Sequence, residues 1–380
     1  MITLSKEVRA LQKKAYQFAQ EHFLANEEAW EERGAFPSET FSNIVQAGYS
    51  GLLTPQAFGG KGHTYLEATL IYEAFARGSF PLTFALGVHN VVGLKLSQEK
   101  IHNPQVKDII RKINSGENIV GIALTEANAG SDPASLETTA SLQGDKYILN
   151  GQKKWVTNGK EADYIAVVAK EEAHPKNTLM LLVDTRNEGV EIVDSPRKSA
   201  ANFVSTPTIQ FTNCVIADKM LISEHGLSAA LQTIDYARLS VAAYCMGLSQ
   251  EALDITTKYV SDRVQFGRPI IQNQGIQWKL AELQTEIEAS RWFIYHVASL
   301  IDAGEMPSTK IAMAKLKASN VAMRVTVECA QLFGANGMLT SHPLARYINY
   351  AKMSEIVDGT SEIQKLIIGG NIAKEALKNK

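Results

Sequence analysis

The chain has 380 residues, of which 45% are hydrophobic and 21% charged, so it is long enough for two or three cooperating domains. Its formal charge of −2, with no cluster of Lys and Arg interleaved with aromatic residues, argues against nucleic-acid binding. No apolar run approaches the ~18 residues of a membrane span, and the first residues lack the apolar core of a signal peptide. We therefore expect a cytoplasmic protein with no nucleic-acid or membrane partner.

Residues 1–119 are predicted to form an N-terminal α-helical domain. Apolar residues recur there at helical spacing, for example at Val8, Leu11, Ala15 and Phe18. A Gly- and Pro-containing loop at residues 55–62 separates two helices, and Gly116 marks the end of the last one.

Residues 120–225 are predicted to form a middle β domain, either a barrel or a sandwich. The hydrophobic pattern changes there to short runs typical of strands. These runs occupy residues 147–149, 165–168, 178–183, 190–193 and 208–215. Asn150-Gly151 predicts a hairpin turn, because both residues tolerate a positive φ angle.

Residues 226–380 are predicted to form a C-terminal four-helix bundle. An apolar stripe from Leu227 to Tyr259 advances mainly by threes and fours, which indicates one helix of over 30 residues. A second stripe, from Ile276 to Ile301, supplies a packing partner. Two more helices are expected at residues 307–333 and 344–377, and short connections favour an antiparallel bundle. The fold class is thus α+β multidomain.

Several kinds of chemistry have no support in this sequence. It contains no GxGxxG after a strand, no GxxxxGK[ST], no GxSxG and no HExxH motif. The eight histidines do not occur at metal-ligand spacing, so we predict no metal site. The three cysteines, Cys214, Cys245 and Cys329, lie far apart among apolar residues, which predicts buried thiols in a reducing compartment.

Residues 356–364 place a carboxylate, Asp358, on a turn directly before a predicted helix start. Ser361 and Gln364 have the spacing of a capping box, and an apolar run resumes at Leu366. A helix N-terminus has partial positive charge and free N–H groups, so it can bind a phosphate. Taken alone, Asp-Gly before Thr and Ser is explained better by ordinary turn and cap chemistry.

The domain order and four motifs together resemble the acyl-CoA dehydrogenase family of flavoproteins. The motifs lie at residues 123–132 (ALTEANAGSD), 155–159 (WVTNG), 263–267 (RVQFG) and 331–337 (QLFGANG), before the turn at 356–364. This resemblance covers essentially the whole chain. It implies bound FAD and α,β-dehydrogenation of an acyl thioester carried by CoA or by acyl-carrier protein. It also implies a homo-oligomer, either a dimer or a dimer of dimers, and electron transfer flavoprotein or oxygen as the electron acceptor.

The resemblance assigns FAD contacts to two domains. Trp155 and Thr157 are two apart on a predicted strand, so a flat ring and a hydroxyl would face the flavin from one side; an ordinary buried Trp beside a turn is the alternative. The implied contacts in the middle domain are Ile122, Leu124, Thr125, Gly130, Ser131, Trp155, Val156 and Thr157. The implied contacts in the C-terminal domain are Arg263, Gln265, Phe266, Gln274, Gln331, Gly334, Ala335, Thr360 and Glu362. In this family, the residues matching Arg263 to Gly334 reach across from a neighbouring subunit.

Asp358 is implied as the catalytic base, which removes the α-proton while the β-hydrogen leaves as hydride. Most relatives have Glu here, and some place the base on the long helix, at the position of Ala237. Asp is shorter by on the order of 1.5 Å, a displacement that can cost about a hundredfold in rate. Val357 and Asn349-Tyr350 also depart from the usual family residues, which indicates a rebuilt substrate pocket and an unusual acyl group.

The implied substrate contacts are Ser131, Asp235, Arg238 and Gly359. Asp235 and Arg238 share one helix face, and a plain surface ion pair is the alternative interpretation.

Two other functions remain open. Nitroalkane oxidases share this fold and use Asp as the base, so a flavin-dependent oxidase of a small carbon acid is one hypothesis. The other is a non-catalytic interaction protein built on the same scaffold.

Overall fold

The computed structural model describes residues 4–99, 101–193 and 195–378, and its N-terminal part is helical. The elements are α1 (Lys6–Ala19), η1 (Gln20–Leu24), α2 (Glu27–Arg33), α3 (Ser38–Gln46), η2 (Gln56–Phe58), α4 (Tyr65–Ala76), α5 (Phe80–Gln98) and α6 (Pro104–Ser115). Gly116, with a φ angle of 85°, ends α6 where the sequence predicted the stop. The predicted helical start of the chain is confirmed.

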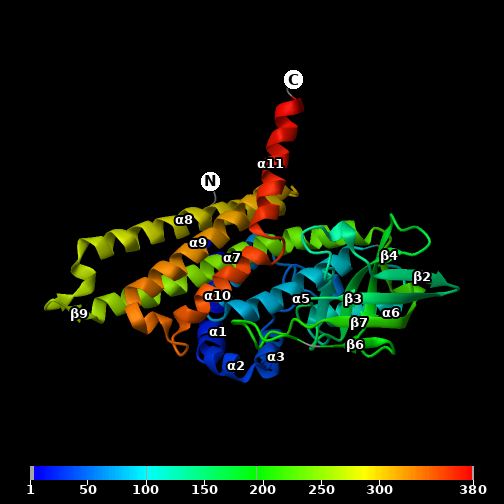
Figure 1. Ribbon diagram of the computed structural model, residues 1–380, viewed down its shortest axis with the longest axis horizontal. Coiled ribbons are helices and arrows are strands. Elements are labelled where there is room, and N and C mark those ends of the chain that lie inside the picture. The colour runs from blue at the N-terminus through cyan, green and yellow to red at the C-terminus, as the bar shows by residue number, and fades with distance from the viewer. Residues whose placement is uncertain (1–3, 100, 194, 379–380) are drawn as a thin grey trace.

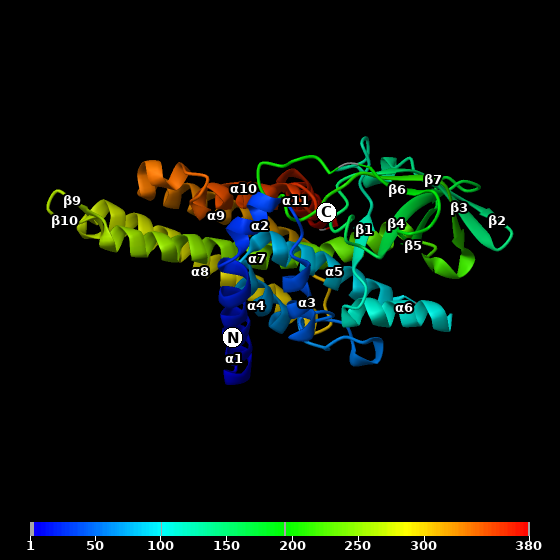
Figure 2. The same cartoon turned by 90° about the horizontal axis from the view of Figure 1, so that it is seen from below.

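Helices α4 and α5 form the interior of this part of the molecule. Almost every residue of α5 is buried, as expected for a helix that is hydrophobic all round. Ser79 caps α5, and Thr64 caps α4 through a capping box with Glu67. Both helices pack on α7 (Gly226–Asp262), and α5 also contacts β1 (Val120–Ala123), as Figure 2 shows. Helix α5 therefore connects the long helix to the sheet.

The middle part of the chain forms one mixed sheet. Besides β1, its strands are β2 (Thr139–Gln143), β3 (Lys146–Lys153), β4 (Tyr164–Glu171), β5 (Thr178–Asp184), β6 (Val190–Ile192), β7 (Ile209–Ala217) and β8 (Leu221–Ser223). Their order is β6-β7-β3-β2-β4-β5-β8, and β1 pairs with β4 in parallel. Residues of β3, β4, β5 and β7 bury a second apolar core that belongs to this sheet.

The predicted hairpin at Asn150-Gly151 is wrong. Strand β3 runs straight through these residues, and its register with β7 shifts between Leu149 and Gly151, which marks a bulge. The Asn150 side chain accepts a hydrogen bond from the N–H of Asn213 at 2.7 Å and so fixes the bulge on its neighbour strand. The hairpin turn lies instead at Gly144-Asp145, between β2 and β3.

Long helices form the C-terminal part, as predicted. Besides α7, they are α8 (Gln274–Asp302), α9 (Ser308–Phe333), α10 (Pro343–Ile356) and α11 (Ser361–Lys378). The continuous helix predicted at 344–377 is wrong, because Asp358 and Gly359 have positive φ angles and break it in two. Figure 1 shows α7, α8 and α9 side by side, with α11 projecting away from them.

The order of helical part, sheet and helical bundle confirms the predicted fold class, whereas the domain borders at residues 119 and 225 stay predictions. All three cysteines are buried free thiols, as predicted. In the described ranges, no helix combines the length and the apolar character that a membrane crossing requires.

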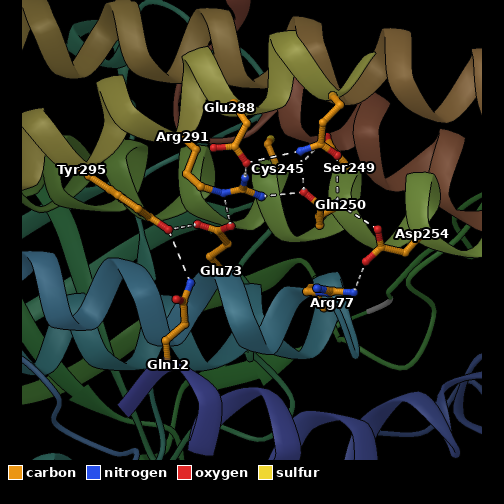
Figure 3. A network of polar contacts seen from close by, with 11 residues as sticks. Gln12, Glu73, Arg77, Cys245, Ser249, Gln250, Asp254, Glu288, Arg291 and Tyr295 are labelled. Carbon is orange, nitrogen blue, oxygen red and sulfur yellow. Dashed lines mark hydrogen bonds and ion pairs between the residues drawn. The ribbon is translucent and has the colours of Figure 1, made fainter. Parts of the chain in front are cut away.

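A buried polar network joins the N-terminal helices to the bundle (Figure 3). The carboxylate of Glu73 on α4 accepts hydrogen bonds from Arg291 Nε at 2.7 Å and from the Tyr295 hydroxyl at 2.6 Å, both on α8. Gln12 on α1 donates to the Tyr295 hydroxyl, and Glu288 pairs with Arg291 on its more exposed side. Glu73 is therefore the shared acceptor that ties α8 to the interior.

We expect Glu73→Ala to lower the free energy of unfolding by about 3 kcal/mol, because it leaves the buried guanidinium of Arg291 without its main partner. The matched control, Glu288→Ala, removes the half-exposed partner of the same Arg291 and should cost less than about 1 kcal/mol. Denaturant unfolding of the two variants checks this. Equal losses of unfolding free energy would show that the buried Glu73 contributes no more to stability than the half-exposed Glu288.

Candidate active site

Asp358 lies on a two-residue left-handed turn between α10 and α11. The φ angles are 52° at Asp358 and 90° at Gly359. A Cβ atom on Gly359 would lie 3.1 Å from Nη2 of Arg238 and 3.0 Å from Nε2 of Gln364, so glycine suits both the backbone and the space. The predicted helix start at Ser361 is confirmed.

The predicted capping box between Ser361 and Gln364 is wrong. Thr360 caps α11 instead: its hydroxyl accepts from the N–H of Ile363 at 3.4 Å, and its carbonyl accepts from the N–H of Gln364. The positive φ angles turn the carbonyl of Gly359 toward the first turn of α11. The side-chain amide of Gln364 therefore donates to this carbonyl, at 2.7 Å.

Three buried side chains from three helices donate hydrogen bonds to the carbonyls of this turn. Arg238 Nε on α7 donates to the carbonyl of Asp358 at 2.9 Å. Lys315 Nζ on α9 donates to the carbonyl of Gly359 at 2.9 Å, beside the Gln364 amide on α11. None of the three donors is more than 7% exposed. The backbone that carries Asp358 is therefore held from α7, α9 and α11 at once.

The carboxyl group of Asp358 lies in a buried environment. Its Oδ2 atom is buried and has no hydrogen-bond partner within the described part of the chain. Burial raises the pKa of Asp358 to about 6, against the opposing charges of Lys315 and Arg238. A carboxylate with a pKa near the working pH can take up a proton and release it again, as a general base must.

Arg238 and Asp235 form a buried ion pair behind this turn. Nη1 of Arg238 lies 2.6 Å from Oδ1 of Asp235, and the Ser308 hydroxyl donates to Oδ2 of Asp235 at 2.9 Å. The pair is therefore not a plain surface ion pair, because both side chains are mostly buried and Arg238 also donates to the carbonyl of Asp358.

The segments that follow β1 and β3 lie side by side. The N–H of Lys154 donates to the carbonyl of Thr125 at 2.8 Å. Lys153 Nζ, fully buried, donates to the carbonyl of Leu124 at 3.0 Å and pairs with Glu126 at 2.6 Å. Burial raises the pKa of Glu126, but hydrogen bonds from Lys153 and from backbone N–H groups outweigh it and hold this pKa below its ordinary value. This arrangement brings together the predicted residues Ile122, Leu124, Thr125, Trp155, Val156 and Thr157.

The predicted strand at Trp155 and Thr157 is wrong, because the chain turns there. Trp155 and Asn158 have φ angles of 60° and 63°, and the Asn158 amide donates to the carbonyl of Ala85 on α5. The Trp155 side chain is 55% exposed, whereas Val156 is buried. An exposed indole on an unusual backbone is available to pack against a flat ring, and this fits the predicted flavin contact. Gly130 and Ser131 lie exposed on the loop between β1 and β2.

The other predicted FAD residues lie elsewhere. Phe266, at the tip of the hairpin β9 (Val264–Gln265) and β10 (Arg268–Pro269), is 99% exposed. Tyr259, near the end of α7, stacks on Phe333, at the end of α9, with ring centroids 4.0 Å apart. The hairpin that follows α7 therefore lies close to the end of α9. Figure 1 shows β9 at the end of the bundle opposite to the sheet. The residues at this end are Arg263, Gln265, Phe266, Gln274, Gln331, Gly334 and Ala335. Thr360 and Glu362 lie instead at the start of α11, next to Asp358.

Sequence reasoning missed Lys315. A signal for it existed, because Lys315 lies four residues after Ile311 and three before Ala318, on the buried stripe of α9. A lysine at such a position needs an acceptor inside the protein.

Family models match the chain along most of its length. The acyl-CoA dehydrogenase N-terminal domain matches residues 5–117, the middle domain 121–214 and the C-terminal domain 224–373. The chain belongs to the acyl-CoA dehydrogenase family. It is therefore an FAD-dependent oxidoreductase that acts on a CH–CH group, and FAD or FADH2 is present in solved structures of similar proteins.

Individual proteins resemble the chain over nearly its full length. Acryloyl-CoA reductase (NADH) of Anaerotignum propionicum is 32% identical, over 98% of this chain and 96% of that protein. The structure of butyryl-CoA dehydrogenase from Megasphaera elsdenii has a TM-score of 0.94 at 27% identity, covering 98% and 100% of the two chains. The prolyl acyl carrier protein oxidase AnaB has a TM-score of 0.92 at 26% identity, covering 97% and 100%.

We expect Asp358→Asn to raise the thermal unfolding midpoint above that of the wild type at about pH 8, and to leave it unchanged near pH 4. The folded-state pKa of Asp358 is raised to about 6, so ionisation costs stability as the pH rises through this value, and the neutral Asn avoids the cost. The control Asp108→Asn, at a half-exposed site on α6, should show no such gain. An equal midpoint for Asp358→Asn and wild type at both pH values would contradict a buried, ionisable Asp358.

Proposed function

We propose that this acyl-CoA dehydrogenase family member uses Asp358 as the base that removes the α-proton of an acyl thioester. The observation that supports this most is the buried Oδ2 atom of Asp358, which has no partner among the described residues although its backbone is held by three donors. Such a carboxylate is fixed in place, and its acceptor atom is left for a ligand.

FAD, when bound, supplies the acceptor for the hydride that leaves the β-carbon. The protein does the proton chemistry: Asp358 takes the α-proton, is neutral afterwards, and returns the proton to solvent after the product leaves. Because C=O and N–H of a trans peptide point in opposite directions, Arg238 and Lys315 also fix the directions of the N–H groups of Gly359 and Thr360. Fixed N–H groups beside the base suit a thioester carbonyl that gains negative charge.

We assign the isoalloxazine contact to the exposed Trp155, with Thr157 and the Leu124-Thr125 segment beside it. A Gly-Ser turn such as Gly130-Ser131 lets backbone N–H groups approach an anion. Ser131 would serve the flavin phosphate and the substrate arm, while Asp235, Arg238 and Gly359 would form the wall near the thioester.

We propose that a homo-oligomer completes the FAD site. Arg263 and Phe266 lie at the far end of their own bundle from Asp358, so they would hold the FAD of a neighbouring subunit. Exposed apolar side chains support such an assembly. They include Phe266 at 99% and, on the projecting helix α11, Leu366 at 69%, Ile372 at 59% and Leu377 at 70%.

We also propose that the acyl group is carried by CoA or by an acyl-carrier protein. Both CoA and an acyl-carrier protein present a pantetheine thioester, and AnaB, an acyl carrier protein oxidase by name, has this fold. The acceptor is electron transfer flavoprotein or oxygen. Three buried free thiols fit a reducing compartment, in line with a cytoplasmic location.

We expect a panel of acyl thioesters, on CoA and on a carrier protein, to bleach the flavin under anaerobic conditions. Asp358→Asn should keep its FAD, seen in the visible spectrum, and lose bleaching by at least about a hundredfold, because no carboxylate is left to take the proton. Asp108→Asn should behave as the wild type. Bleaching by nitroalkanes alone would favour the small-carbon-acid oxidase instead, and rapid bleaching of Asp358→Asn would show that another group is the base.

A further inference from the structure

Lys315 is a fully buried lysine, and no carboxylate of the described residues is in contact with it. It is 0% exposed, and among the residues that the structure describes it forms no ion pair. Its ammonium group donates to the neutral carbonyl of Gly359. Burying a charge without an opposite charge in contact is costly, so this arrangement calls for a reason beyond packing.

Charged and titratable groups from two helices and from the turn lie near this ammonium group. They are Arg238 and Cys245 on α7, Glu355 on α10 and Asp358 at the start of the turn. Burial lowers the pKa of Lys315, and the negative charge of Asp358 opposes that effect. Asp235 faces the same region but is held by Arg238 and Ser308. Tyr244, buried on α7, also lies within electrostatic reach of Asp358.

Lys315 and Gln364 act on the same atom but differ in charge. Both donate to the carbonyl oxygen of Gly359, whose two lone pairs can serve two donors. Two donors to one carbonyl, Lys315 and Gln364, therefore hold the turn in position. The positive charge close to the carboxylate comes from Lys315 and from Arg238, because the Gln364 amide is neutral.

We propose that Lys315 is a positioning residue for the base: it holds the Asp358–Gly359 turn through the Gly359 carbonyl, and its charge keeps the Asp358 carboxylate ionised between turnovers. This inference rests on the proposed function of Asp358. Arg238, which donates to the carbonyl of Asp358, also places a positive charge near the carboxylate, and Gln364 also holds the carbonyl of Gly359.

The pH dependence of anaerobic flavin reduction separates these contributions. Lys315→Met should move the lower midpoint of the profile upward by about one pH unit, the low end of the effect of a nearby opposite charge. Gln364→Met removes a donor without a charge, so it should lower the plateau and leave the midpoint in place. The control Lys317→Met removes the same charge from an exposed position on α9 and should change neither.

An infrared titration tests the same claim without turnover. The carboxyl band of Asp358, found by subtracting the spectrum of Asp358→Asn, should titrate at higher pH in Lys315→Met than in wild type. If Lys315→Met does not fold, Lys315→Gln, which keeps a donor and removes the charge, should give the same shift.

The two proposals fail in different ways. Retained flavin reduction in Asp358→Asn would reject Asp358 as the base. Loss of reduction in Asp358→Asn, together with a wild-type midpoint and a wild-type carboxyl titration in the Lys315 variants, would reject the role of Lys315 alone.

Discussion

The site depends on hydrogen bonds to two carbonyl oxygens, those of Asp358 and Gly359. Helices α7, α9 and α11 each supply a buried donor to these carbonyls. Without these donors the buried carbonyls would lack partners, at a cost on the order of 1–3 kcal/mol each. The long helices therefore do more than enclose a core, because their packing decides where the carboxylate of Asp358 lies.

A second constraint is the balance between burial and charge around Asp358. Burial alone would push the carboxyl toward its neutral form, which cannot accept a proton. Two cations, Arg238 and Lys315, work against this, and the resulting pKa of about 6 leaves the group mostly ionised at neutral pH and still able to bind a proton. Their own charges are balanced unequally, since Arg238 has Asp235 in contact and Lys315 has a neutral carbonyl.

The sequence predicted the large features because they depend on long periodic patterns, as with the stripe from Leu227 to Tyr259 and the order of the three parts. It failed where tertiary contacts override local preference. Asn150-Gly151 has the dipeptide of a tight turn, yet pairing with β7 makes it a bulge. Gln364 has the spacing of a cap, yet it binds the carbonyl of Gly359. The role of Lys315 depends on a residue 44 positions away, which no local pattern reveals.

Exchange of the substrate α-proton with solvent reports directly whether Asp358 acts as the base. An acyl thioester without transferable β-hydrogens, incubated with the FAD-loaded enzyme in deuterated buffer, reports proton removal alone when it is followed by NMR. We expect rapid exchange in wild type, slower exchange near neutral pH in Lys315→Met, and none above background in Asp358→Asn. Exchange at the wild-type rate in Asp358→Asn would contradict the assignment of Asp358 as the base.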